Sequence, residues 1–235
     1  MKIEIGGFQK QSFIDYPKKI SSIIFTIGCN FRCPYCHNSN LLYAEKIKNI
    51  SELKILSYLQ NNKKYIDGVV ITGGEPTLHG DLPEFIAKVK SFGYSVKLDT
   101  NGTNPEMLRK LIDNNLLDFI AMDIKAPLEF QKYNKATGGM LTEKLFENVK
   151  KSIHIIINSG VDYEFRITLV PTILAKKDVV KICSFIKNAN LFCLQKFNPE
   201  NALNKEFQKL RPFEENEVNS IIEECLPYIR NIIYR

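Results

Sequence analysis

The sequence predicts an α/β fold, namely a partial (β/α)6 barrel, and three observations support this prediction. Short β-branched runs alternate six times with longer amphipathic runs, as expected of a parallel sheet covered by helices. The chain has 235 residues, whereas a closed eightfold barrel typically takes about 250. Polar residues and glycines follow several of the predicted strands, which is where such folds bind ligands. A doubly wound sheet shares these properties and stays open as an alternative.

The predicted strands are short β-branched runs that end at polar or turn residues. In chain order they cover residues 20–26, 68–72, 95–99, 118–124, 163–170 and 191–197. The predicted helices cover residues 51–61, 81–91, 104–115, 142–159, 177–190 and 212–232. Several helices begin at Ser, Thr, Asp or Asn, whose side chains cap the first free amides. Ahead of the first unit, Ile3 and Ile5 alternate with Lys2 and Glu4, which indicates a strand rather than a signal peptide.

The composition is that of one globular domain covering residues 1–235, with a core over about 14–200 and a C-terminal helix over 212–232. No uncharged apolar run approaches the ~18 residues of a membrane span, so we expect a cytoplasmic protein with no membrane partner. The net charge is +6, but the 32 basic and 26 acidic residues are interspersed. No platform of basic and aromatic residues stands out, so we expect no nucleic-acid partner.

Three cysteines in one short arc of chain carry most of the chemical information. Cys29, Cys33 and Cys36 have the spacing C-x3-C-x2-C. A 4Fe-4S cluster normally takes four thiolates, so three would leave one iron open to bind and reduce a ligand. A structural zinc site is the alternative, but it requires a fourth ligand. His37 follows Cys36 too directly to serve easily, and the other cysteines lie far along the chain. The spacing therefore favours an open cluster over zinc.

Three further motifs follow predicted strands, as the cysteine arc follows the first one. They are Gly73-Gly74-Glu75-Pro76, Asp99-Thr100-Asn101-Gly102 and Asp123-Ile124-Lys125. Because the carboxyl ends of parallel strands meet at one edge of a sheet, we expect these motifs to share one site with the arc.

Together these motifs resemble those of the radical S-adenosylmethionine (SAM) superfamily, whose signature pair is the cysteine arc and the Gly-Gly-Glu-Pro turn. Within it the sequence is similar to glycyl-radical-enzyme activases, most of all to the type that activates anaerobic ribonucleoside-triphosphate reductase. The motifs that carry this narrower resemblance are Cys36-His37-Asn38, Leu98-Asp99-Thr100-Asn101-Gly102, Asp123-Ile124-Lys125, Phe13-Ile14-Asp15-Tyr16-Pro17, Tyr163-Glu164-Phe165-Arg166 before Val170-Pro171, and Leu194-Gln195-Lys196-Phe197. The resemblance implies a partial barrel of the radical SAM type, open on one side.

The resemblance also implies an activity. In this superfamily SAM binds the open iron of a 4Fe-4S cluster and is cleaved reductively to methionine and a 5′-deoxyadenosyl radical. In the activases the radical abstracts hydrogen from a glycine of a partner enzyme, here expected to be anaerobic ribonucleotide reductase. No side chain is expected to be catalytic beyond the cluster and SAM. Only 36 residues separate Cys36 from Gly73, so we expect one cluster and an external flavodoxin or ferredoxin as electron donor.

The resemblance assigns SAM contacts near the cluster to two motifs. Tyr35 and His37 are expected to lie against the adenine, and Gly73 and Gly74 to present main-chain groups to the methionine amino group. Glu75 is placed in the same site, where bracing the turn fits it better than acid-base work. An ordinary loop aromatic, a surface histidine and plain turn chemistry are the alternatives.

Acidic and basic residues at later strand ends are expected to hold the polar end of SAM. Asp99, with Thr100 beside it, and Asp123 would bind the ammonium group, or share a monovalent cation with the carboxylate. Lys125 would be a counter-charge for that carboxylate or a ribose contact. Arg166 lies in an apolar strand and is expected to face the lumen near SAM or an acid. Helix capping by Asp99, an Asp123–Lys125 salt bridge and a strand-edge pair for Arg166 are the alternatives.

Asp15, Tyr16 and Pro17 are expected either to line a mouth that admits the glycine loop of the partner or to form a plain turn. A His that some activases place near the last strand end has no counterpart between residues 195 and 201. Two other functions stay open. One is a radical SAM enzyme that acts on a small molecule, and the other is a non-catalytic zinc or iron-sulfur module.

Overall fold

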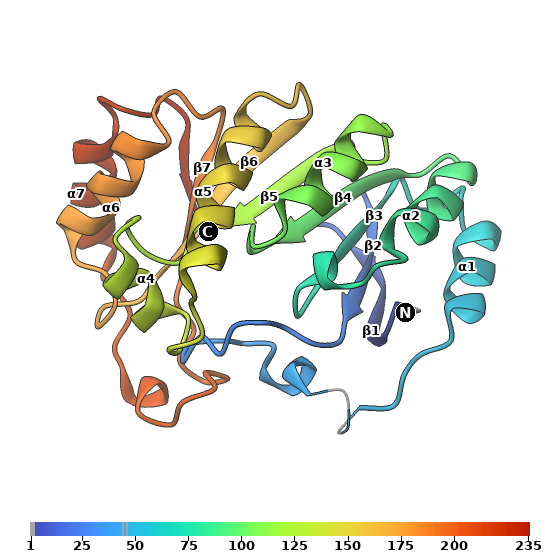
Figure 1. Cartoon of the computed structure of the whole chain (residues 1–235), viewed down its shortest axis with the longest axis horizontal. Coiled ribbons are helices and arrows are strands. Elements are labelled where there is room, and N and C mark those ends of the chain that lie inside the picture. Colours follow the sequence, from blue (N-terminus) through green and yellow to red (C-terminus); the bar gives the residue numbers. More distant parts are fainter. Residues whose placement is uncertain (1–2, 44, 46) are drawn as a thin grey trace.

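The computed structural model describes residues 3–43, 45 and 47–235, and an eight-stranded sheet forms its centre (Figure 1). The strands lie in sequence order across the sheet, so each one pairs with the next along the chain. They are β1 (Ile5–Ser12), β2 (Ser21–Thr26), β3 (Gly68–Gly73), β4 (Ser95–Thr100), β5 (Phe119–Asp123), β6 (Asp162–Leu169), β7 (Phe192–Lys196) and β8 (Ile232–Tyr234). β1 runs antiparallel to β2, and the other neighbours are parallel.

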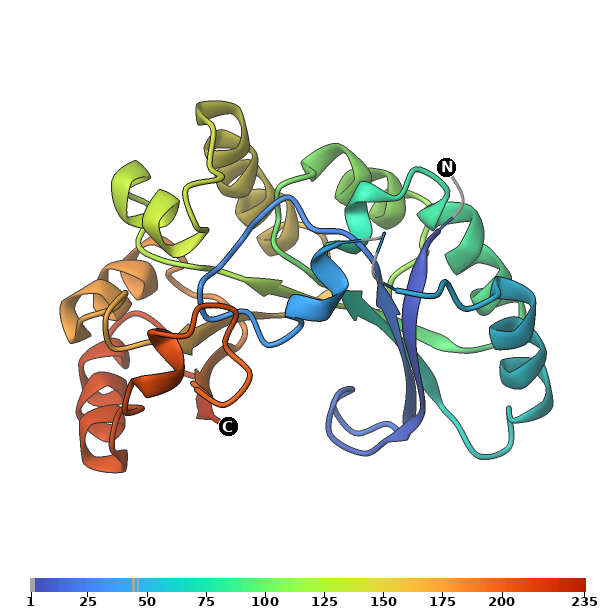
Figure 2. The same ribbon diagram turned by 90° about the horizontal axis from the view of Figure 1, so that it is seen from below.

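Seven α-helices in the described part of the chain cover the outer face of this sheet (Figure 2). They are α1 (Glu52–Asn61), α2 (Leu82–Ser91), α3 (Pro105–Asp113), α4 (Phe130–Ala136), α5 (Glu143–Ile157), α6 (Lys176–Phe185) and α7 (Glu215–Cys225). Their apolar faces pack on strand side chains such as Val96, Ile120 and Phe165 to form the main core. β1 and β8 are the two edges of the sheet and do not pair with each other. The predicted open, partial barrel is therefore confirmed.

All six predicted strands are present, with bounds that differ by one residue at most at each end. Three features at the C-terminal side differ from the prediction. The helix predicted over 177–190 is α6, which ends at Phe185. The helix predicted over 212–232 ends at Cys225, two residues before Pro227, which cannot donate an amide to a continuing helix. The chain then returns as β8, which pairs with β7. The short helix α4 was also not predicted.

The local sequence explains why β3 is a strand and where α3 begins. β3 reads Gly-Val-Val-Ile-Thr-Gly, and its β-branched side chains suit a strand buried on both faces. Asn104 caps α3 by accepting a hydrogen bond from the amide of Met107 at 3.1 Å. No helix in the described residues combines the length and hydropathy that a membrane crossing requires.

Candidate functional site

A cavity of about 390 Å³ lies at the carboxyl ends of the parallel strands. Every residue that the sequence predicted as a metal or cofactor ligand lines it. These residues are Cys29, Cys33, Tyr35, Cys36, His37, Gly73, Gly74, Glu75, Asp99, Thr100, Asp123, Lys125 and Arg166. The structure thus brings together segments that are up to 137 positions apart in the sequence, from Cys29 to Arg166.

The cysteine arc, residues 28–38, is tied to distant parts of the chain by its backbone. The amide of Arg32 donates to the carbonyl of Thr137 at 3.1 Å, and the amide of Asn204 donates to the carbonyl of Pro34 at 2.9 Å. Gly138 has φ +72°, and a Cβ there would lie 2.1 Å from the Arg32 carbonyl oxygen. These contacts fix the path of the arc over the cavity.

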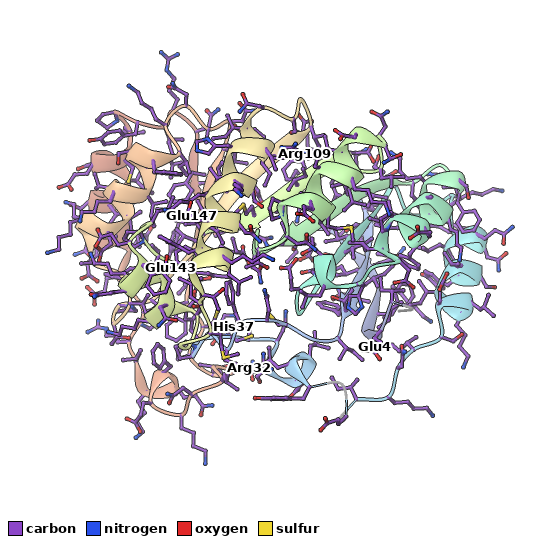
Figure 3. The ribbon with its side chains drawn as sticks, in the orientation of Figure 1. Glu4, Arg32, His37, Arg109, Glu143 and Glu147 are labelled. Carbon is purple, nitrogen blue, oxygen red and sulfur yellow. The ribbon has the colours of Figure 1, made fainter. Side chains whose placement is uncertain are left out.

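His37 and Tyr35 flank the last cysteine in different ways. The His37 ring stacks on Phe197, with centroids 6.3 Å apart and an interplanar angle of 14°. Its Nε2 atom lies 2.7 Å from the Asn198 carbonyl oxygen. Tyr35 is buried, with its side chain in the main core. Figure 3 shows Arg32 and His37 on the arc, away from Arg109 and Glu147 on the outer helices. Both predicted contact residues therefore have fixed positions beside the cysteines.

Gly73 and Gly74 allow the arc and the end of β3 to approach each other very closely. A Cβ on Gly74 would lie 1.9 Å from the Gly28 carbonyl oxygen. That same oxygen accepts a hydrogen bond from the Glu75 amide at 2.8 Å. Gly73 has φ +115°, a left-handed conformation that favours glycine, and a Cβ there would lie 2.3 Å from the Thr26 amide nitrogen. The glycine pair thus has a packing role in addition to any contact with a ligand.

Glu75 braces the turn, as expected. Its carboxylate is 1% exposed and accepts hydrogen bonds from the Thr100 hydroxyl at 2.7 Å and the Asn101 amide at 2.6 Å. The amide of Thr77 donates to it at 3.1 Å. Burial raises the pKa of Glu75, although these hydrogen bonds favour the charged form. The carboxylate joins the turn after β3 to the turn after β4.

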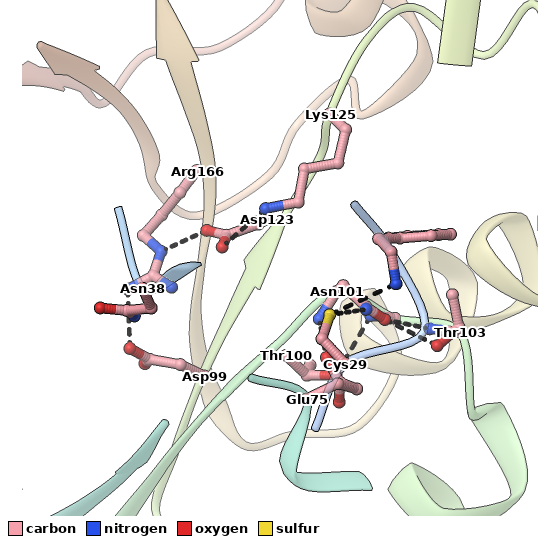
Figure 4. Close-up of polar contacts among 12 residues, drawn as sticks. Cys29, Asn38, Glu75, Asp99, Thr100, Asn101, Thr103, Asp123, Lys125 and Arg166 are labelled. Atoms are coloured by element: carbon pink, nitrogen blue, oxygen red, sulfur yellow. Dashed lines mark hydrogen bonds and ion pairs between the residues drawn. The ribbon is translucent and has the colours of Figure 1, made fainter. Parts of the chain in front are cut away.

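Asn101 places an amide donor beside one of the cysteine sulfurs, a feature that sequence reasoning did not single out. Its Nδ2 atom lies 3.9 Å from Cys29 Sγ and 2.9 Å from Asn30 Oδ1 (Figure 4). Thr103 accepts from Asn30 at 2.8 Å and donates to Asn101 Oδ1 at 2.7 Å. The Phe31 amide also donates to Cys29 Sγ, at 3.4 Å. Hydrogen bonds to the sulfurs of an iron-sulfur cluster tune the reduction potential of that cluster.

Arg166 joins the acids at the ends of β4 and β5 (Figure 4). Its Nε donates to Asp123 at 2.7 Å and its Nη1 donates to Asp99 at 3.1 Å. Lys125 Nζ donates to Asp123 at 3.1 Å, so the salt bridge considered as an alternative does form. Lys97, which was not predicted, is 1% exposed and pairs with Asp99. Arg166 therefore faces the lumen next to acids, which confirms that expectation.

The charged side chains around Arg166 shift one another's pKa values. Burial alone would raise the pKa of Asp99 and Asp123, but Arg166 and the neighbouring lysines outweigh it and hold both pKa values below the ordinary range. Each of the four carboxylate oxygens already has a cationic partner. Lys125 and Arg166 have more N–H donors than these bonds use. The spare hydrogen-bonding capacity in the cavity therefore suits an anionic or hydroxyl-bearing group.

Two expectations about the mouth have different outcomes. Asp15 lines the cavity, which agrees with the first of its two alternatives, a place at the mouth. Tyr16 does not, because its ring is 3% exposed and packs against Ile23 and Val70. Gln195, from β7, lines the cavity close to where the sequence lacks the expected histidine.

The three cysteines of the arc share the cavity. They line one cavity, and no other cysteine does. Among the described residues, no three His, Cys, Asp or Glu side chains converge as ligands of one metal ion. In a 4Fe-4S cube each thiolate ligates a different iron, so three thiolates would leave one iron open. Burial raises the pKa of Cys29 to about 11 and of Cys33 to about 12. Binding of the cluster would therefore displace the thiol protons.

Comparison with known proteins gives one family. The family model of the radical SAM superfamily matches residues 23–186. A protein of Methanocaldococcus jannaschii, provisionally named a glycyl-radical enzyme activating enzyme, is 36% identical over 237 aligned residues, which cover 100% of this chain and 97% of that protein. The pyruvate formate-lyase-activating enzyme of Clostridium pasteurianum is 28% identical and covers 78% of this chain and 76% of its own length.

The fold is similar to that of solved structures as well. SuiB of Streptococcus suis, bound to the precursor peptide SuiA, superposes with a TM-score of 0.68 at 13% identity. The match covers 91% of this chain and 48% of SuiB. At this identity the similarity concerns the fold alone.

Proposed function

Because the chain belongs to the radical SAM superfamily and is an enzyme of that class, we propose that it activates a glycyl-radical enzyme, most specifically anaerobic ribonucleoside-triphosphate reductase. The observation that carries the proposal is the cavity in which three cysteines meet the charged ends of β4, β5 and β6. A relative named as a glycyl-radical enzyme activating enzyme is similar along the whole chain, and this similarity supports the proposal. The reductase as partner rests on the sequence motifs.

Cys29, Cys33 and Cys36 would hold a 4Fe-4S cluster. When bound, this cluster supplies the electron that cleaves SAM to methionine and a 5′-deoxyadenosyl radical, which takes a hydrogen atom from glycine. Asn101 and the Phe31 amide donate toward Cys29 Sγ and would stabilise its negative charge. The chain itself therefore binds and orients, and it supplies no acid or base for the chemistry.

The polar end of SAM would meet donors rather than acceptors. Lys125 and Arg166 have spare N–H groups for its carboxylate or ribose hydroxyls, while Asp99 and Asp123 hold these two cations in place. Gln195 on β7 would contact SAM in place of the histidine that some activases have near the last strand end.

The remaining contacts are proposed from the resemblance. Tyr35 and His37 would border the adenine, and Gly73, Gly74 and Thr100 would lie at the methionine end of SAM. A monovalent cation beside Asp99 and Asp123 would have to compete with Arg166 and the lysines, so we rank it below direct binding of SAM.

Electrons would come from a separate flavodoxin or ferredoxin. The chain has no second arc of cysteines, and Cys183, Cys193 and Cys225 are fully buried on α6, β7 and α7. A single cluster then needs an external one-electron donor for each SAM cleaved.

The test is anaerobic reconstitution with iron and sulfide, then reduction in the presence of SAM and the purified reductase. We expect about four irons per chain, formation of 5′-deoxyadenosine, and a glycyl radical on the reductase by electron paramagnetic resonance. Deoxyadenosine without a protein radical would reject this partner and favour a small-molecule substrate. A protein that binds zinc and no iron would reject the activity altogether.

A further inference from the structure

The turn between β1 and β2 presents two adjacent large apolar side chains to solvent. Phe13 is 73% exposed and Ile14 is 82% exposed. No other pair of neighbouring large hydrophobic residues in the described part of the chain is exposed to this degree. Leu53, at 77%, is comparably exposed but stands alone on α1. A fixed, contiguous apolar feature of this kind marks a contact surface more often than an isolated one does.

The turn is anchored from within, so it does not fold these two side chains away. Tyr16 is buried against Ile23 and Val70. The Ser12 hydroxyl donates to the Asp15 carboxylate and accepts from the Ile14 amide at 3.3 Å. Phe13 and Ile14, which form the tip of the β1–β2 turn, therefore point into solvent. Ser12 and Tyr16 on either side of them are buried against the barrel.

The tip lies at the amino ends of the parallel strands, opposite the cysteine arc, but still borders the cavity. Asp15, the next residue, lines the same cavity as the three cysteines. Figure 2 shows the β1–β2 turn at the open side of the barrel, where no strand closes the sheet. A molecule that covers Phe13 and Ile14 is therefore in position to extend a narrow segment past Asp15 into the site.

We propose that Phe13 and Ile14 anchor the protein substrate, by packing on an apolar patch beside the glycine loop that enters the cavity. This inference rests on the proposed function. A small substrate would lie within the cavity of about 390 Å³ and leave both side chains in water. A loop delivered by a protein must be held from outside, because the rest of that protein stays outside the cavity. Exposed Lys18, at the edge of the turn, suits an acidic rim around the apolar patch.

The test compares the double variant Phe13→Ser/Ile14→Ser with Leu53→Ser, a matched control of similar exposure on the outer helix α1. Reconstituted proteins are assayed for deoxyadenosine formation with dithionite and SAM alone. They are then titrated with anaerobic ribonucleoside-triphosphate reductase, and the glycyl radical is measured by electron paramagnetic resonance. We expect the double variant to cleave SAM within twofold of the wild-type rate. It should need at least tenfold more reductase for half-maximal radical, whereas Leu53→Ser behaves as wild type.

An unchanged half-saturating reductase concentration in the double variant would overturn the inference. So would a parallel loss of SAM cleavage, which would mean that the tip supports the cavity and not the partner. A wild-type protein that cleaves SAM but forms no radical on the reductase, or on pyruvate formate-lyase as a second probe, gives a different pattern. It would refute the proposed function, and the anchor with it.

Discussion

Replacement of Gly74 by alanine should separate the packing role of the glycine pair from its backbone freedom. Gly74 has no left-handed φ, so alanine brings no dihedral strain there. Its Cβ would nevertheless lie 1.9 Å from the Gly28 carbonyl oxygen, whereas ordinary contact begins at 3.4 Å. The arc or the end of β3 must therefore shift by about 1.5 Å. Forced packing of this kind typically costs about 1–3 kcal/mol.

This shift of the arc should also reduce binding of the 4Fe-4S cluster, because Cys29 directly follows Gly28. The assay is urea unfolding of the metal-free protein together with iron content after anaerobic reconstitution. Gly80→Ala is the matched control, since a Cβ there meets nothing within 4 Å and the residue is exposed. It should be neutral or slightly stabilising, by up to about 1 kcal/mol. If Gly74→Ala unfolds at the wild-type urea concentration and loads iron fully, the close approach of arc and strand is not the constraint described above.

Three further perturbations test the site and the fold. Arg166→Leu should cost about 1.5–3 kcal/mol at pH 7, because two half-buried carboxylates lose their shared partner and keep one lysine each; urea unfolding at several pH values measures it. Since the pKa values of those carboxylates are depressed in the folded wild type, their stabilisation is present above about pH 4 and lost as pH falls. The gap between wild type and variant should therefore close in acid, and a constant gap would contradict the assignment. Asn104→Ala should remove the α3 cap and cost about 1 kcal/mol, lowering Tm by about 2–4 °C; no change in a calorimetric scan would count against the cap. Cys36→Ala should lose iron after reconstitution while Cys193→Ala, buried on β7, keeps it; equal iron contents would argue against the assigned ligands.

The strands were predictable because each is a β-branched run that ends at a turn. Their carboxyl ends must share one edge of a parallel sheet, so motifs such as Asp99-Thr100 and Asp123-Ile124-Lys125 could be assigned to one site from the sequence. Arg166, as a charge within an apolar strand, was expected to face the lumen near SAM or an acid, and it lies there next to Asp99 and Asp123.

What could not be predicted depends on packing across the sheet. Lys97 lies two positions before Asp99 on the same face of β4, yet only the pairing of the strands shows that it is buried in the lumen. The approach of Asn101 to Cys29 depends on how the arc folds back. Pro227 was a local signal for the end of α7, but the three residues of β8 are too few to be recognised without their partner strand.

The side-by-side order of the strands has a consequence for biosynthesis. Each strand can join the growing sheet as soon as it leaves the ribosome, because its neighbour has already been made. The cysteine arc is among the first segments translated, but its backbone forms hydrogen bonds with Thr137 and Asn204, which are translated much later. The arc therefore reaches its final conformation only after these residues have been made. Maturation with iron would then come last, after nearly the whole polypeptide is in place.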